Sequence, residues 1–215
     1  MMKGISFGKN HTYDDWNLVL VKKVIGLPTP KVSSVEVEGA DGYIDTSEVL
    51  AGEIKFNNRT LAFEFTMMDD YEFFEERVTE IANYLHGKKM RIILDDDEDY
   101  YYYGRCAINE WTSEKRMGKI VISCDCEPYK ISLRPTVVNA KINGNTQVKI
   151  YNTRKTVTPV ITCNTNTVKL TINKETFNLS KGDNIVSELF LYDGINALTF
   201  SGVGNVTITF TGGEL

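Results

Sequence analysis

Five consecutive acidic residues followed by four tyrosines form the stretch of this sequence most able to do chemistry. The stretch reads DDDEDYYYY and covers residues 95–103. Two carboxyl groups can work as general acid and base, and a row of carboxylates can bind Ca²⁺. Tyrosine faces can also stack on sugar rings. Each chemistry needs its own arrangement in space, so the elements around residues 95–103 decide which one applies.

The acidic stretch lacks the residues that complete a calcium-binding loop. Asp95, Asp97 and Asp99 fit the first, third and fifth positions of an EF-hand loop. However, Tyr100 stands where the sharp turn needs glycine, and Cys106 stands where the bidentate glutamate belongs. We therefore expect no specific metal site there, with weak adventitious cation binding as the alternative.

Zinc binding and cofactor binding are not indicated either. The chain has four cysteines and two histidines, and no two cysteines have the C-x-x-C spacing of a zinc site. The glycines of GVGNVT, residues 202–207, have no third glycine after them and open no helix, so they do not predict a dinucleotide site. We expect no metal and no cofactor.

Catalysis is not indicated by any motif of the chain. The sequence has no G-x-S-x-G elbow, no H-E-x-x-H helix and no P-loop. Neither histidine indicates a catalytic triad, since His11 lies in a polar loop and His86 at the end of a predicted helix. Adjacent carboxylates at a hairpin tip would all be solvated, whereas acid–base catalysis needs two carboxyl groups with different pKa values. We expect no catalytic residues and no enzyme.

The acidic turn and the aromatic strand after it are candidate interface elements. We interpret the turn as an exposed, charged loop that resists edge pairing, with contact to a basic partner surface as the alternative. Strict alternation places Tyr101, Tyr103 and Trp111 on one face of the strand and leaves the other face apolar too. A strand covered on both faces indicates a closed barrel or a partner subunit. The candidate interface residues are Asp95, Asp96, Asp97, Tyr100, Tyr101, Tyr102, Tyr103 and Trp111.

One helix is predicted over about residues 70–86. Apolar residues recur there at spacings of four, three and four, in the order Phe74, Val78, Ile81, Leu85. Asp69 and Glu72 fit a capping box at its start. Gly87 fits the position just after the helix, and lysines follow to complement the helix dipole.

Strands are predicted on both sides of this helix. Residues 89–94, 100–111 and 118–126 read as three consecutive strands of a meander. The segment VSSVEVEG, residues 32–39, alternates valine and glutamate as a half-buried strand does, and residues 39–53 read as a long loop.

The composition changes near Leu133. Residues 1–134 hold 17 Lys/Arg and 24 Asp/Glu, while residues 135–215 hold 7 and 5. The second part is rich in Thr and Asn and consists of short alternating runs separated by turn signals, which is typical of a β-sandwich. We expect two domains, residues 1–133 and 134–215.

The overall charge and hydropathy exclude two classes of protein. The formal net charge of −5 disfavours non-specific nucleic-acid binding, which depends on lysine and arginine. No stretch approaches the ~20 apolar residues of a membrane span, and the N-terminus lacks the apolar run of a secretory signal. We expect no membrane insertion.

Four segments together resemble the N-terminal domain of the distal tail protein (Dit) family of long-tailed phages and prophages. They are GISFGKNHTYDDWNLVLV, VEVEGADGYIDTSEVLAGEIKFNNRTLAFEF, ANYLHGKKMRIILDDDEDYYYYGRCAINEW and CDCEPYK. The most specific pieces are G-x-D-G-x-x-D at 39–45, LHGKKMRIILDDD at 85–97 and Cys-Glu-Pro-Tyr at 126–129. The resemblance extends over residues 4–130.

The resemblance implies a fold and a structural role. The fold would be mainly β: an N-terminal split β-barrel with one helix, followed by a galectin-like β-sandwich. Six copies would close into a ring at the virion tail tip, after assembly in the host cytoplasm. One ring face would meet the tail-tube protein and the other the tail-associated or fibre hub protein. DNA would only pass through the lumen, and the sandwich would hold receptor-binding proteins or touch the host. The alternative is a lectin-like adhesion module of a tail tip.

Overall fold

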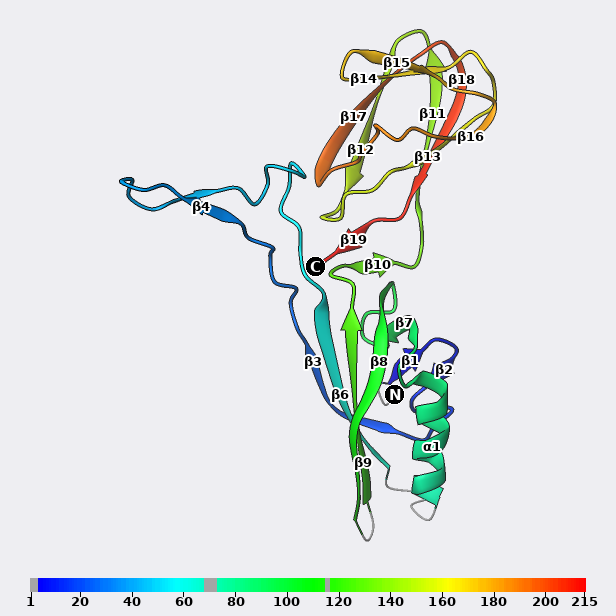
Figure 1. Ribbon diagram of the computed structural model, residues 1–215. Helices are drawn as coiled ribbons and strands as arrows, with labels where there is room; N and C mark the ends of the chain where they lie inside the picture. The colour runs from blue at the N-terminus through cyan, green and yellow to red at the C-terminus, as the bar shows by residue number, and fades with distance from the viewer. Residues whose placement is uncertain (1–3, 68–72, 115–116) are drawn as a thin grey trace. The chain divides into compact units, whose positions relative to one another are not determined.

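Two compact units make up the chain in this computed structural model, which describes residues 4–67, 73–114 and 117–215. Contacts between residues divide the chain after Lys130, whereas the sequence places the domain boundary after Leu133. The first unit contains the helix and a large sheet, and the second, Ile131–Glu214, contains two smaller sheets (Figure 1). The predicted fold class, mainly β with one helix and a C-terminal sandwich, is confirmed for the described residues.

The first unit is built on an antiparallel sheet in the order β2-β1-β7-β8-β9-β6-β3 (Figure 1). Its strands β7, β8 and β9 form the meander that the sequence predicts. The bounds are β1 (Ile5–Phe7), β2 (Asn10–His11), β3 (Val19–Ile25), β6 (Arg59–Met67), β7 (Lys89–Leu94), β8 (Tyr100–Glu114) and β9 (Met117–Cys126).

The sheet of the first unit curls but does not close. Its edge strands are β2 and β3, and among the described residues these edges do not pair with each other. The barrel is therefore split between β3 and the hairpin of β1 and β2. Of the two alternatives that the sequence leaves for a strand covered on both faces, the closed barrel is wrong. The buried side chains of β6 and β9 and one face of the helix fill the inside of the curled sheet.

The helix α1 (Phe74–Leu85) buries the apolar stripe that its spacing predicts. Phe74, Val78, Ile81 and Leu85 are its buried residues. Gly87 follows in the left-handed conformation at φ 75°, and Lys88 Nζ donates to the carbonyl of Asn83, 2.8 Å away. Both features are typical of a helix C-terminus. The predicted start at residue 70, and the capping residues Asp69 and Glu72, lie outside the described residues.

Residues 31–53 form a two-stranded ribbon, here named the arm, that leaves β3 and returns to β6. Its strands β4 (Ser34–Glu36) and β5 (Tyr43–Asp45) pair with each other alone. Every residue from Lys31 to Asp45 is exposed. The strand predicted over residues 32–39 is present as β4, but the prediction that it is half-buried is wrong, because nothing in the described chain covers its valines. The predicted loop over 39–53 contains β5.

The second unit is a β-sandwich of two four-stranded sheets, as predicted. One sheet has the order β11-β18-β13-β16 and the other β12-β17-β14-β15, and their facing side chains form one core. The bounds are β11 (Thr136–Asn143), β12 (Thr146–Asn152), β13 (Val160–Cys163), β14 (Lys169–Ile172), β15 (Glu175–Asn178), β16 (Gly182–Ile185), β17 (Gly194–Ser201) and β18 (Val203–Phe210). Two further short strands, β10 (Lys130–Ser132) and β19 (Gly213–Glu214), pair with each other and belong to neither sheet of the sandwich. Within the described residues, no helix has the length and apolar character needed to cross a bilayer.

Candidate functional site

The four tyrosines at the start of β8 alternate between the core and the opposite face of the sheet. Tyr101 and Tyr103 lie away from the core, where the Arg91 guanidinium carbon and the Lys89 ammonium each lie 4.7 Å from the centre of a ring. Such cation–π contacts are worth about 0.5–1 kcal/mol at exposed sites. The two rings are half-buried under these cations, so the sheet surface there is both aromatic and basic.

On the core side, Tyr100 and Tyr102 also stack with cations. Lys130 Nζ lies 4.2 Å from the Tyr100 ring centre, and the Arg59 guanidinium carbon lies 5.1 Å from that of Tyr102. Tyr102 is buried in the first unit's core, and this burial raises the pKa of its phenol. Tyr102 is therefore a core residue, whereas the other three tyrosines are partly accessible.

A β-bulge moves Trp111 to the face opposite the one that strict alternation predicts. The pairing of β8 with β9 shifts between Ile108 and Glu110, so Trp111 stands opposite Ile120, on the core side. Because the bulge adds one residue, every later side chain changes face. The prediction that Trp111 shares a face with Tyr101 and Tyr103 is wrong. Trp111 is nevertheless 51% exposed.

The first three aspartates of the acidic turn each bind a different part of the first unit. Asp95 Oδ2 accepts a hydrogen bond from the Gly4 N–H at 2.6 Å and lies 3.3 Å from Nε2 of His11. Asp97 Oδ2 lies 2.9 Å from Nζ of Lys130. The third pair joins Asp96 to Lys23 of β3. All three carboxylates are only about 30% exposed, so the prediction of a fully solvated turn is wrong for them.

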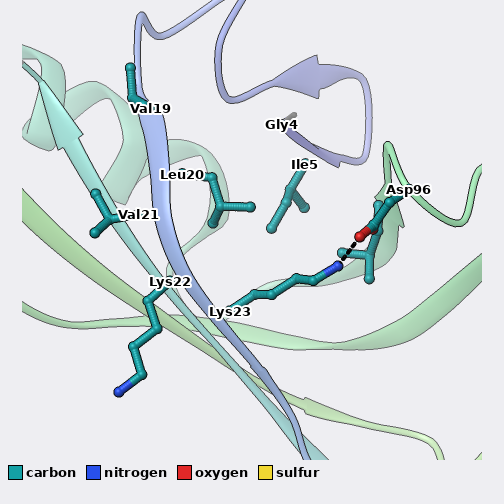
Figure 2. A pocket seen from close by; sticks show the side chains of 9 residues that line it. Gly4, Ile5, Val19, Leu20, Val21, Lys22, Lys23 and Asp96 are labelled. Atoms are coloured by element: carbon teal, nitrogen blue, oxygen red, sulfur yellow. Dashed lines mark hydrogen bonds and ion pairs between the residues drawn. The ribbon is translucent and has the colours of Figure 1, made fainter. Parts of the chain in front are cut away.

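The split of the barrel contains a slot that the sequence did not indicate. It has a volume of about 290 Å³ and lies between β3 and the residues of β1 and β7 (Figure 2). Ile5, Leu20 and Leu94 give it apolar walls. The Lys23–Asp96 pair crosses it (Figure 2). Two lysines, Lys22 and Lys23, and one carboxylate, Asp96, line the slot beside its apolar side chains.

Metal binding has no support in the described residues. No group of three or more histidine, cysteine, aspartate or glutamate side chains could hold an ion there. The Sγ atoms of Cys106 and Cys124 lie 3.3 Å apart as free thiols in the core. Burial raises the pKa of the Cys126 thiol to about 12, so this sulfur is a poor metal ligand and a poor nucleophile near neutral pH.

Comparison with known proteins gives a strong likeness in structure alone. No family model and no curated protein sequence matches this chain. The crystal structure of the Dit protein of phage SPP1 aligns with 98% of this chain and 99% of its own, at a TM-score of 0.73 and 14% identity. This chain has the fold of SPP1 Dit. That protein is described as a paradigm of the hub adsorption apparatus in phages that infect Gram-positive bacteria.

The alignment with SPP1 Dit covers both units, so the Dit-like fold extends beyond residues 4–130, where the sequence resemblance lies. A conserved Pseudomonas aeruginosa protein of unknown function also aligns, over 90% of this chain and all of its own. Its TM-score of 0.30 and identity of 8% are too low to support an argument.

Proposed function

We propose that this chain is the distal tail hub protein of a phage, a prophage or a phage-like particle. Six copies close into a ring that joins the tail tube on one face to the tail-associated or fibre hub protein on the other. The observation that carries the proposal is the fold shared with SPP1 Dit over nearly the whole length of both chains. The four sequence segments that resemble the Dit family add to it, because all of them lie in the first unit.

A structural role also fits the chemistry of the candidate residues. The aspartates of the turn bind parts of their own unit, and the tyrosines stack with cations. These groups hold the sheet together and present a surface, and none of them is placed to act on a substrate. A non-enzymatic hub that contacts other tail proteins requires only a stable sheet and accessible surfaces.

The sandwich is proposed as the peripheral part of the hub, galectin-like and available for receptor-binding proteins or the host surface. Exposed aromatic side chains favour direct adhesion as a second candidate function. Tyr151 is 64% exposed, and the rings of Phe190 and Tyr192 lie 6.4 Å apart on the same unit. Binding of the full chain to host cell-wall glycans, lost in Tyr192→Ala, supports adhesion, while no binding leaves only the scaffold role.

Mass in solution and electron micrographs of the purified protein test the ring. One chain has a mass of 24.3 kDa, so six copies give about 146 kDa. We expect that mass by sedimentation or native mass spectrometry, together with six-fold rings around a central hole in negative stain. A monomer that stays monomeric when the neighbouring tail proteins are added contradicts the proposal.

A further inference from the structure

The arm presents apolar side chains that no described part of its own chain covers. Val35 and Ile44 face each other across the ribbon at 51% and 58% exposure, and Tyr43, on the other face, is 69% exposed. An isolated two-stranded ribbon is at best marginally stable in water. Clustered apolar side chains on an exposed element mark an interaction site. The arm therefore needs a partner surface to cover it.

Backbone hydrogen bonds preform the arm before any partner binds. Thr46 N donates to Ser33 O at 2.8 Å, and Lys31 N donates to Lys55 O at 2.7 Å at the base of the ribbon. Binding by a preformed element costs less conformational entropy than binding by a disordered one. The arm can therefore act as a docking element without folding on its partner first.

The charge of the arm restricts what can cover it. Residues 31–53 contain six acidic residues and one lysine, a net charge of −5, which equals the net charge of the entire chain. Glu36, Glu38 and Asp41 form no ion pair with any described residue. An apolar and acidic arm fits a surface that is apolar and basic.

Such a surface exists on the first unit of the same chain. It is the side of β7 and β8 that faces away from the core, here named the basic face: Lys89, Arg91, Tyr101, Tyr103 and Arg105. Lys89 is paired with Glu127 at 2.9 Å, but Arg91 and Arg105 have no carboxylate partner among the described residues. The two tyrosine rings supply apolar area beside these guanidinium groups.

We propose that the arm of one copy docks on the basic face of a second copy of this chain. Glu36 and Glu38 lie against Arg91 and Arg105, and the Val35–Ile44 pair packs on the tyrosine rings. Because arm and face are different surfaces, the contact is heterologous and can close into a ring, as the proposed function requires. The inference rests on that proposed function and assigns the contact that closes the ring.

Two charge-reversed variants, one for each surface, test the contact when they are measured separately and as a mixture. The arm-reversed variant is Glu36→Lys with Glu38→Lys, and the face-reversed variant is Arg91→Glu with Arg105→Glu. Each variant alone opposes like charges, so we expect its association constant to fall about tenfold or more in sedimentation velocity. In an equal mixture, the arm of each variant meets a face of opposite charge on the other variant. We therefore expect rings of wild-type mass in which the two variants alternate.

A matched control carries the same charge change on the sandwich. Glu175→Lys with Glu188→Lys alters two exposed residues there and should assemble as the wild type does. Circular dichroism melting checks that all variants fold.

The outcomes separate this inference from the proposed function. If either reversed variant forms rings as the wild type does, the arm–face contact is wrong and the hub stands. If both variants lose the ring and their mixture does not recover it, each surface binds a different protein and the inference is again wrong. A wild-type chain that is monomeric both alone and in its particle overturns the hub together with the contact.

Discussion

Asp95, Asp96 and Asp97 show how far residue types alone can mislead. The sequence places five carboxylates at a strand-to-strand turn, which the structure confirms for the turn itself. Their partners Gly4, Lys23 and Lys130 come from three distant segments, and only the curled sheet brings these near. Local sequence cannot reveal such long-range pairing, so the turn was expected to be solvated.

Removing the carboxylate of Asp95 should destabilise the first unit. Asp95→Ala leaves the partly buried Gly4 N–H without its acceptor, so we expect a loss of about 1–3 kcal/mol in the free energy of unfolding. Urea denaturation followed by fluorescence measures it. Glu98→Ala is the control, because Glu98 is exposed in the same turn, and its effect should stay within about 0.5 kcal/mol. Equal effects of the two substitutions would contradict a structural role for Asp95.

The thiol of Cys126 should make the stability depend on alkaline pH. Its pKa is raised by burial from 9.0 to about 12, so the thiol ionises more easily in the unfolded chain than in the native one. The stability that it contributes is complete below pH 9 and is lost as the pH rises toward 12. The expected slope is about 1.4 kcal/mol per pH unit for this one group.

Comparison with Cys126→Ala isolates that slope from other groups that titrate in the same range. Urea denaturation of both proteins at several pH values between 9 and 11 provides the measurement. The variant should lose stability less steeply as the pH rises. Parallel slopes for the two proteins would mean that the Cys126 thiol is not protected in the native state.

At the scale of elements, an alternating or helical pattern of apolar residues predicts the structure correctly where one side of the element packs on the core. It misleads where the element packs on nothing or where a bulge interrupts the strand. The stripe of α1 and the meander β7–β9 are visible in the sequence because one side of each packs on the core. The valines of residues 32–39 alternate in the same way, yet the arm packs on nothing in the described chain. The bulge at Ile108–Glu110 has no signal in the sequence, so strict alternation assigns Trp111 to the wrong face of the sheet.

Gly118 is a position where an element contact depends on the absence of a side chain. A Cβ at Gly118 would lie 2.3 Å from the ring of Phe74, the first residue of α1. Gly118→Ala should therefore push the start of the helix away from β9, at a cost of about 1–3 kcal/mol. Thermal unfolding measures it. The double variant with Phe74→Leu should lose less than the sum of the two single variants, since the smaller side chain relieves the clash. Strict additivity would contradict this contact.

At the scale of the whole molecule, the assembly follows from what a single copy leaves uncovered. The arm and the basic face have opposite charges, and Glu36, Glu38, Arg91 and Arg105 have no ion-pair partner among the described residues. If electrostatic attraction brings the copies together, the wild-type ring should dissociate more readily in 0.5 M NaCl than in 0.1 M, because salt screens exposed charges. Mass photometry at both salt concentrations measures this, and an unchanged ring population would argue for a purely apolar contact.

Cryo-electron microscopy of the particle that contains this protein tests the central claim most directly. We expect averaged density at the distal end of the tail tube to contain six copies of this fold around an open channel, with the first unit of each copy in the ring. Density for this chain elsewhere in the particle, or a tail tip that lacks a ring of six such copies, would contradict the account.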